Sequence, residues 1–128
     1  MDLTHIHHVA IIVQDYEKAR HFYVDLLGFK VIRDVERPER NDRILYLALS
    51  DCELEIFVKP DAPPRPGYPQ PESQGLRHLA FKVESVEQTV KDLNILGIET
   101  ESVRSDTFTG KPMTFFHDPD GLPLEIHE

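Results

Sequence analysis

Residues 8–13, His-Val-Ala-Ile-Ile-Val, and residues 78–83, His-Leu-Ala-Phe-Lys-Val, share the pattern His, apolar, Ala, apolar, any residue, Val at an offset of 70 positions. The similarity continues along the chain, because residues 54–56 and 124–126 both read Leu-Glu-Ile at the same offset. Self-similarity at a fixed offset is typical of repeated structural units. The sequence therefore predicts two copies of one module.

Each copy of this repeat is followed by a segment with helical periodicity. Apolar residues recur there at i, i+3 or i+4, and i+7. They are Ala19, Phe22, Tyr23, Leu26 and Leu27 in the first copy and Val86, Val90, Leu93 and Leu96 in the second. Each segment is closed by a glycine, Gly28 or Gly97, which readily adopts the left-handed conformation that ends many helices. We therefore predict one helix in each module.

The remaining apolar and alternating segments predict strands. They cover residues 8–13, 29–35, 43–48 and 53–58 in the first module and 78–83, 100–103, 113–117 and 124–127 in the second. A hairpin turn is predicted at residues 118–121, Asp-Pro-Asp-Gly. Only a few polar residues separate 45–49 from 53–58, which favours antiparallel hairpins over a parallel sheet. The predicted fold class is α+β, with two tandem βαβββ modules forming one curved mixed sheet.

The length of 128 residues fits one domain over residues 1–128. Residues 60–73 hold six of the ten prolines and predict an extended connector. The first module then covers about 4–59 and the second about 74–128. The mixed-charge run at residues 34–43 is interpreted as a solvated loop.

The net charge of −9 argues against nucleic acid or an anionic membrane as the main partner, because both bind basic surfaces. A small-molecule partner is predicted instead. The sequence shows neither a membrane-spanning apolar run nor a signal peptide, and Cys52 has no partner for an internal disulfide. We therefore expect a cytoplasmic location.

Two histidines and two glutamates occupy equivalent places in the repeat: His8 with Glu55, and His78 with Glu125. Imidazole nitrogens and carboxylate oxygens suit Zn, Ni, Co, Mn or Fe(II). Both glutamates stand between apolar neighbours, where an unpaired buried carboxylate would be unfavourable. The alternative is that the glutamates are solvated and the histidines are bound within the protein. His5 and His7 lack repeat partners and are predicted to be bystanders.

The segments HHVAIIV, FYVDLLGF, LEIF, GLRHLAFKV and FFHDPDGLPLEIHE resemble the vicinal oxygen chelate superfamily, and within it proteins similar to glyoxalase I (lactoylglutathione lyase). The resemblance implies the glyoxalase/bleomycin resistance/dioxygenase fold with a partial barrel. It also implies one divalent metal ion, Ni, Zn, Co or Mn, bound by His8, Glu55, His78 and Glu125. The four ligands come from one chain or from both chains of a homodimer.

The resemblance further implies isomerisation of a 2-oxoaldehyde–thiol hemithioacetal to a 2-hydroxyacyl thioester, by metal-assisted proton transfer through an enediolate. Glu125 is the predicted base, and Glu55 can replace it in that role. Similar proteins hold glutathione with an Arg and an Asn where this chain has Ile12 and Lys59, so the thiol stays open. Lys59 and Lys82 are the candidate substrate-binding residues, with a surface position as the alternative for Lys82.

Three other functions are compatible with this superfamily. An epimerase keeps four ligands, a ring-cleaving dioxygenase uses two histidines and one carboxylate, and a metal-free drug-binding or resistance protein usually loses the ligands. The filled set of four positions favours the isomerase and the epimerase. Arg77, Arg104 and Lys111 could bind an anionic part of the substrate, although surface positions are more common for such residues.

Overall fold

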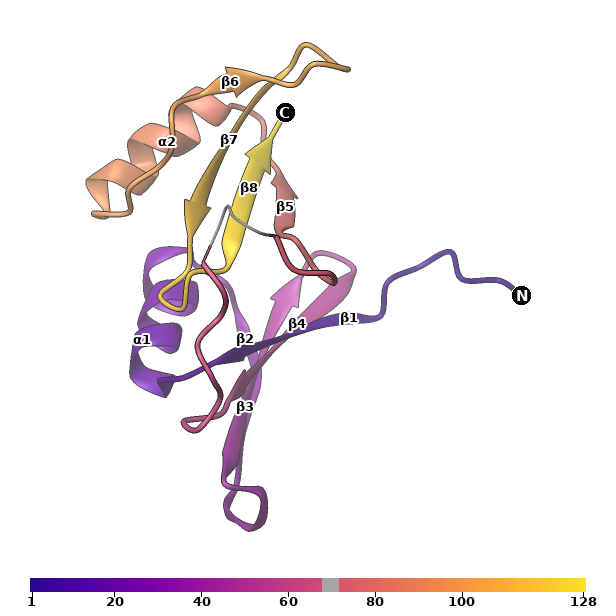
Figure 1. Ribbon diagram of the computed structural model, residues 1–128, viewed down its shortest axis with the longest axis vertical. Helices are drawn as coiled ribbons and strands as arrows, with labels where there is room; N and C mark the ends of the chain where they lie inside the picture. The colour runs from indigo at the N-terminus through magenta and orange to yellow at the C-terminus, as the bar shows by residue number, and fades with distance from the viewer. Residues whose placement is uncertain (68–71) are drawn as a thin grey trace. The chain divides into compact units, whose positions relative to one another are not determined.

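The computed structural model describes residues 1–67 and 72–128, so residues 68–71 of the predicted connector lie outside the described residues. The chain divides into two compact units, residues 1–64 and 65–128. Each unit contains a helical segment and a four-stranded mixed sheet (Figure 1). The predicted α+β fold with tandem βαβββ modules is confirmed, but the strands form two hydrogen-bonded sheets, one in each module, instead of the one sheet predicted, because the backbone hydrogen bonds link only strands of the same module.

The first module has the order strand, helix and three strands. Its elements are β1 (His8–Val13), α1 (Tyr16–Arg20), the π-helical turn η1 (His21–Leu26), β2 (Val31–Arg37), the 3₁₀ turn η2 (Pro38–Arg40), β3 (Asp42–Leu49) and β4 (Cys52–Val58). The strand order in the sheet is β1-β4-β3-β2. Strand β1 is parallel to β4, and the other two pairings are antiparallel.

The second module repeats this topology. Its elements are β5 (Leu79–Lys82), α2 (Val86–Ile95), β6 (Arg104–Ser105), β7 (Pro112–His117) and β8 (Pro123–His127), with the strand order β5-β8-β7-β6. The register is repeated as well, since Ala10 faces Glu55 and Ala80 faces Glu125 across the parallel pairs. The sequence repeat is therefore a repeat of backbone pairing.

The ends of both helical segments are those expected from the sequence, and the structure adds how the segments begin. The side chains of Asp15 and Ser85 accept hydrogen bonds from backbone N–H groups three residues later, which satisfies donors at the first turn. Gly28 and Gly97 have φ values of +78° and +79°, which confirms their predicted role at the helix ends. The π-helical turn η1 between Arg20 and Gly28 was not predicted.

In each sheet, successive side chains of a strand alternate between the core face and the opposite face. In β1, Ile11 and Val13 are buried in the core, whereas Ile12 on the opposite face is 57% exposed. In β4 the residues of the core face are Leu54, Ile56 and Val58. The opposite face of this sheet carries His8 and Glu55, and we call it the first His–Glu face. By the same register, the second His–Glu face carries His78 and Glu125.

The prediction of a strand at residues 100–103 is wrong, because strand pairing begins only at Arg104 opposite Met113. The Thr114 hydroxyl donates to the carbonyl oxygens of Glu101 and Ser102, at 2.9 and 3.3 Å, so these acceptors are bound by a side chain. The turn at residues 118–121 is confirmed by the hydrogen bond from the Gly121 N–H to the Asp118 carbonyl.

The solvated loop predicted at residues 34–43 is also wrong, since β2 extends to Arg37 and β3 begins at Asp42. Only the 3₁₀ turn η2 and Asn41 separate these strands. Within the described part of the chain, no helix is both long and apolar enough to cross a membrane.

Candidate functional site

The first candidate pair consists of His8 on β1 and Glu55 on β4. Their side chains share a face because Glu55 is in register with Ala10, two residues after His8. The His8 Nε2 atom lies 3.9 Å from the Glu55 Oε2 atom. The His8 side chain is 44% exposed and the Glu55 side chain 15%, so the carboxylate is largely screened while the imidazole borders solvent.

The second pair repeats this arrangement more tightly. The His78 Nε2 atom lies 2.9 Å from the Glu125 Oε2 atom, at hydrogen-bond distance. The His78 imidazole and the Phe115 ring also pack in a T-shaped arrangement, with centroids 5.1 Å apart. Phe115 faces Glu125 across the β7–β8 ladder, so one aromatic side chain contacts the histidine beside the glutamate.

The donor set of both pairs fits a divalent cation. Neighbouring ligands in an octahedral shell with bonds of about 2.1 Å lie about 3 Å apart, which is close to the His78–Glu125 separation. Glu125 is a buried carboxylate, and such a group is stabilised by an opposite charge. Considered separately, each module contributes one pair, and neither brings three potential ligands together among residues 1–67 and 72–128.

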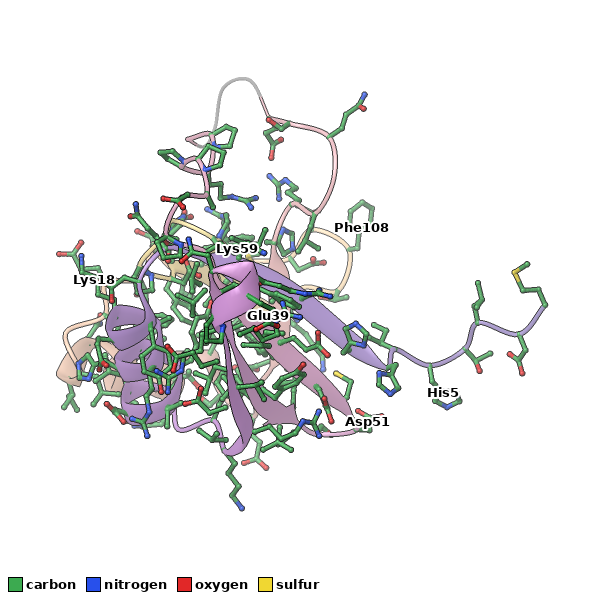
Figure 2. All side chains as sticks on the ribbon, turned by 90° about the horizontal axis from the view of Figure 1, so that it is seen from below. His5, Lys18, Glu39, Asp51, Lys59 and Phe108 are labelled. Atoms are coloured by element: carbon green, nitrogen blue, oxygen red, sulfur yellow. The ribbon has the colours of Figure 1, made fainter. Side chains whose placement is uncertain are left out.

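The three histidines near the N-terminus differ in their contacts. His5 lies on the extended segment that precedes β1, away from the sheet (Figure 2). The His7 Nδ1 atom, in contrast, lies 2.9 Å from the His8 Nδ1 atom. His7 therefore contacts the ring nitrogen of His8 that is not paired with Glu55, which differs from the bystander role predicted for His7. Strand alternation does not predict this contact, because His7 precedes the strand.

A buried charged cluster lies on the first His–Glu face, beyond Glu55. Asp42, whose side chain is 1% exposed, accepts two hydrogen bonds from Arg37 at 2.7 Å and one from Lys59 at 3.0 Å. These hydrogen bonds lower the pKa of Asp42 from 3.8 to about 2. Both cations also lie over the Phe57 ring, which follows Glu55 by two residues. Two cations on one carboxylate leave the cluster with a net positive charge.

The two lysines singled out by sequence occupy different settings. Lys59 is part of the Asp42 cluster, two residues beyond Phe57. Lys82 is exposed on β5, in register with His127 of β8. Arg37 and Asp42 were missed as members of this cluster, although their register opposite each other in β2 and β3 follows from the hairpin that joins these strands.

Sequence comparison identifies a family match for nearly the whole chain. The family described as Glyoxalase/Bleomycin resistance protein/Dioxygenase superfamily matches residues 5–126. The chain is 51% identical over 129 residues to YwkD, an uncharacterized protein of Bacillus subtilis (strain 168), and the match covers 100% of this chain and 99% of YwkD.

Two further relatives extend the comparison. The crystal structure of a glyoxalase family protein from Enterococcus faecalis is 57% identical, with a TM-score of 0.93 and coverage of 100% of both chains. The mitochondrial methylmalonyl-CoA epimerase of Bos taurus is 29% identical over 132 residues, covering 99% of this chain and 75% of the epimerase.

Proposed function

The chain belongs to the glyoxalase/bleomycin resistance protein/dioxygenase superfamily, and from this premise we propose that it is a metal-dependent isomerase of the glyoxalase I kind. Its substrate is the hemithioacetal of a 2-oxoaldehyde and a thiol, and its product is a 2-hydroxyacyl thioester. The observation that carries the proposal is the repeated contact between a histidine and a glutamate, at 3.9 Å in the first module and 2.9 Å in the second.

His8, Glu55, His78 and Glu125 would hold one divalent ion, within one chain or across a homodimer. Held by these residues, the ion would remain accessible to oxygens of the substrate. An ion bound there supplies Lewis-acid chemistry, because it stabilises negative charge on these oxygens when the neighbouring carbon loses a proton.

Glu125 is the proposed base. Its carboxylate takes the proton from the carbon that bears the thiol and returns it to the adjacent carbon, which becomes the carbon of the 2-hydroxy group. This isomerisation needs no other reactant, since the proton taken from carbon returns to the adjacent carbon and the hydroxyl proton of the hemithioacetal passes to the neighbouring oxygen. Burial of Glu125 limits its exchange with water, and Glu55 is the equivalent carboxylate if the roles are reversed.

Lys59 and Lys82 are the proposed substrate-binding residues. Lys59 belongs to a cluster of net positive charge on the first His–Glu face, which suits an anionic group of the thiol. Ile12, exposed on the same face, offers an apolar contact instead of a charge. A thiol other than glutathione is compatible with this combination.

An epimerase is the second candidate function, favoured by the similarity to methylmalonyl-CoA epimerase. It would use the same four residues, and a proton removed from one face of a carbon would be returned to the opposite face. The two candidates share the removal of a proton from carbon, and they differ in the carbon to which the proton returns and in their substrates.

A panel assay tests the first candidate. Methylglyoxal is mixed with glutathione, cysteine or bacillithiol in the presence of protein loaded with Ni, Zn, Mn or Co, and thioester absorbance is recorded. We expect turnover with at least one combination. The Glu125→Gln variant should retain the ion and lose activity by about 100-fold or more, the usual effect of removing a positioned base.

Glu53→Gln is the matched control, because Glu53 lies two residues before Glu55 on the same face but pairs with Arg33. It should keep more than half of the wild-type activity. No turnover in the whole panel would reject the isomerase and leave the epimerase. Full activity of Glu125→Gln would reject Glu125 as the base.

A further inference from the structure

In both modules an arginine lies against an aromatic ring beside the His–Glu pair. The Arg33 Cζ atom is 4.4 Å from the centroid of the Tyr46 ring, and Tyr46 faces Glu55 across the β3–β4 ladder. The Arg104 Cζ atom is 5.4 Å from the centroid of the Phe115 ring. Because Phe115 faces Glu125, the repeat places a guanidinium on the ring opposite each glutamate.

The ion pairs of these arginines use little of their donor capacity. Arg104 contacts Glu101 at 3.2 Å, with side-chain exposures of 55% and 38%. Arg33 contacts Glu53 at the same distance. A guanidinium has five N–H donors, and an exposed ion pair is weak. Arg104 can therefore donate to a further acceptor while it stays on the Phe115 ring.

The second module contains a pocket at this point. Arg104, Phe115 and His78 line it, and its other walls include Arg77, Glu101 and Pro123. Arg77 and Arg104 supply two guanidinium groups to these walls, each also paired with an exposed carboxylate, Glu72 and Glu101, while Phe115 and Pro123 supply apolar contact. A small anion with a short carbon skeleton matches both properties, and the planar fork of arginine suits a carboxylate.

We propose that Arg104 is a specificity-determining residue, which favours substrates that carry a carboxylate, in a hemithioacetal that of the thiol part, close to the carbons that react at the His–Glu pair. The assignment of this pocket to the substrate rests on the proposed function. The preference of the pocket for a carboxylate is independent of the proposed function, because binding of a simple dicarboxylate is measured without turnover. Arg33 is the counterpart of Arg104 in the first module.

Calorimetric titration of the purified protein with malonate and with malonamide tests this inference. The two probes share a three-carbon skeleton with two carbonyl oxygens, and only malonate carries carboxylates. We expect wild type to bind malonate more tightly, and Arg104→Leu to weaken malonate by about fivefold to tenfold with less than a twofold effect on malonamide. Arg104→Lys should retain part of the preference.

Arg20→Leu is the matched control, because Arg20 also forms an exposed ion pair, with Asp25, but lies on α1 of the first module. It removes the same charge and should leave both affinities unchanged. Equal losses in Arg20→Leu and Arg104→Leu, equal losses for both probes, or no loss at all would overturn the inference. The titrations are made without added metal, and nickel binding is measured separately by equilibrium dialysis. Failure of the proposed metal site is therefore distinguished from failure of this inference.

Discussion

The strongest test of the candidate centre is the stabilisation of the chain by nickel when one ligand is removed. The structure supplies two candidate ligands from each module, so an ion held by both pairs loses one of four ligands in His78→Ala and equally in His8→Ala. We expect each substitution to weaken binding by at least about 100-fold.

The size of the effect follows from linkage. At a free nickel concentration about 100 times the wild-type dissociation constant, binding stabilises the folded chain by about 2.7 kcal/mol. The unfolding entropy of a chain of 128 residues is roughly 0.27 kcal/mol/K, from about 2.1 cal/mol/K per residue, so the midpoint rises by about 10 °C. After a 100-fold loss of affinity the gain is about 0.4 kcal/mol, or about 1.5 °C.

Differential scanning calorimetry with and without nickel measures these shifts, and equilibrium dialysis gives the stoichiometry. Glu53→Gln serves as the control, since it neutralises a carboxylate on the same face and should keep the full shift. Two ions for each chain, or a His78→Ala variant that retains more than half of the wild-type shift, would refute a centre built from both pairs.

Three other predictions follow from single contacts. Asp42→Asn should destabilise the protein most above about pH 4 and progressively less as the pH falls towards 2, because the folded-state pKa of Asp42 is depressed to about 2; urea midpoints across this range check it. His7→Ala should weaken nickel binding by about tenfold in dialysis, because the His8 ring loses its Nδ1 contact, whereas His5→Ala should not. Gly97→Ala should lower the free energy of unfolding by about 1 kcal/mol in urea titrations, because its φ of +79° strains any residue with a Cβ.

The sequence predicted the topology because two periodicities constrained it together. Period-two alternation predicted β1 at residues 8–13, as observed, and the offset of 70 transferred the pattern to the second module. The repeat singled out His8 and Glu55, and the structure brings these two side chains into contact on one face of the sheet. Local pattern and repeat were sufficient here because both residues lie on regular neighbouring strands.

Features that depend on contacts between side chains and distant backbone were not predictable in this way. The shift of β6 arises from the Thr114 hydroxyl, which binds two carbonyl oxygens of the preceding segment. The Asp42 cluster joins the end of β2 at Arg37, the start of β3 at Asp42 and the residue after β4, Lys59. Arg37 and Lys59 lie five and seventeen residues from Asp42 in sequence. A charged run such as residues 34–43 is interpreted as a solvated loop from sequence alone. Only the strand register shows that Arg37 and Asp42 face each other, with Arg37 over the Phe57 ring.

The two His–Glu faces share a topology but surround the same pair differently. On the first face, Glu53 is in register with His8 and adds a carboxylate, held by Arg33, two residues from Glu55. The second module has Pro123 two residues before Glu125, and that glutamate is buried with His78 at 2.9 Å. A base that exchanges a proton with substrate has to be shielded from water and from competing charges. The repeat therefore supplies two equivalent carboxylates, and their unequal surroundings favour Glu125 over Glu55 for the proposed proton transfer.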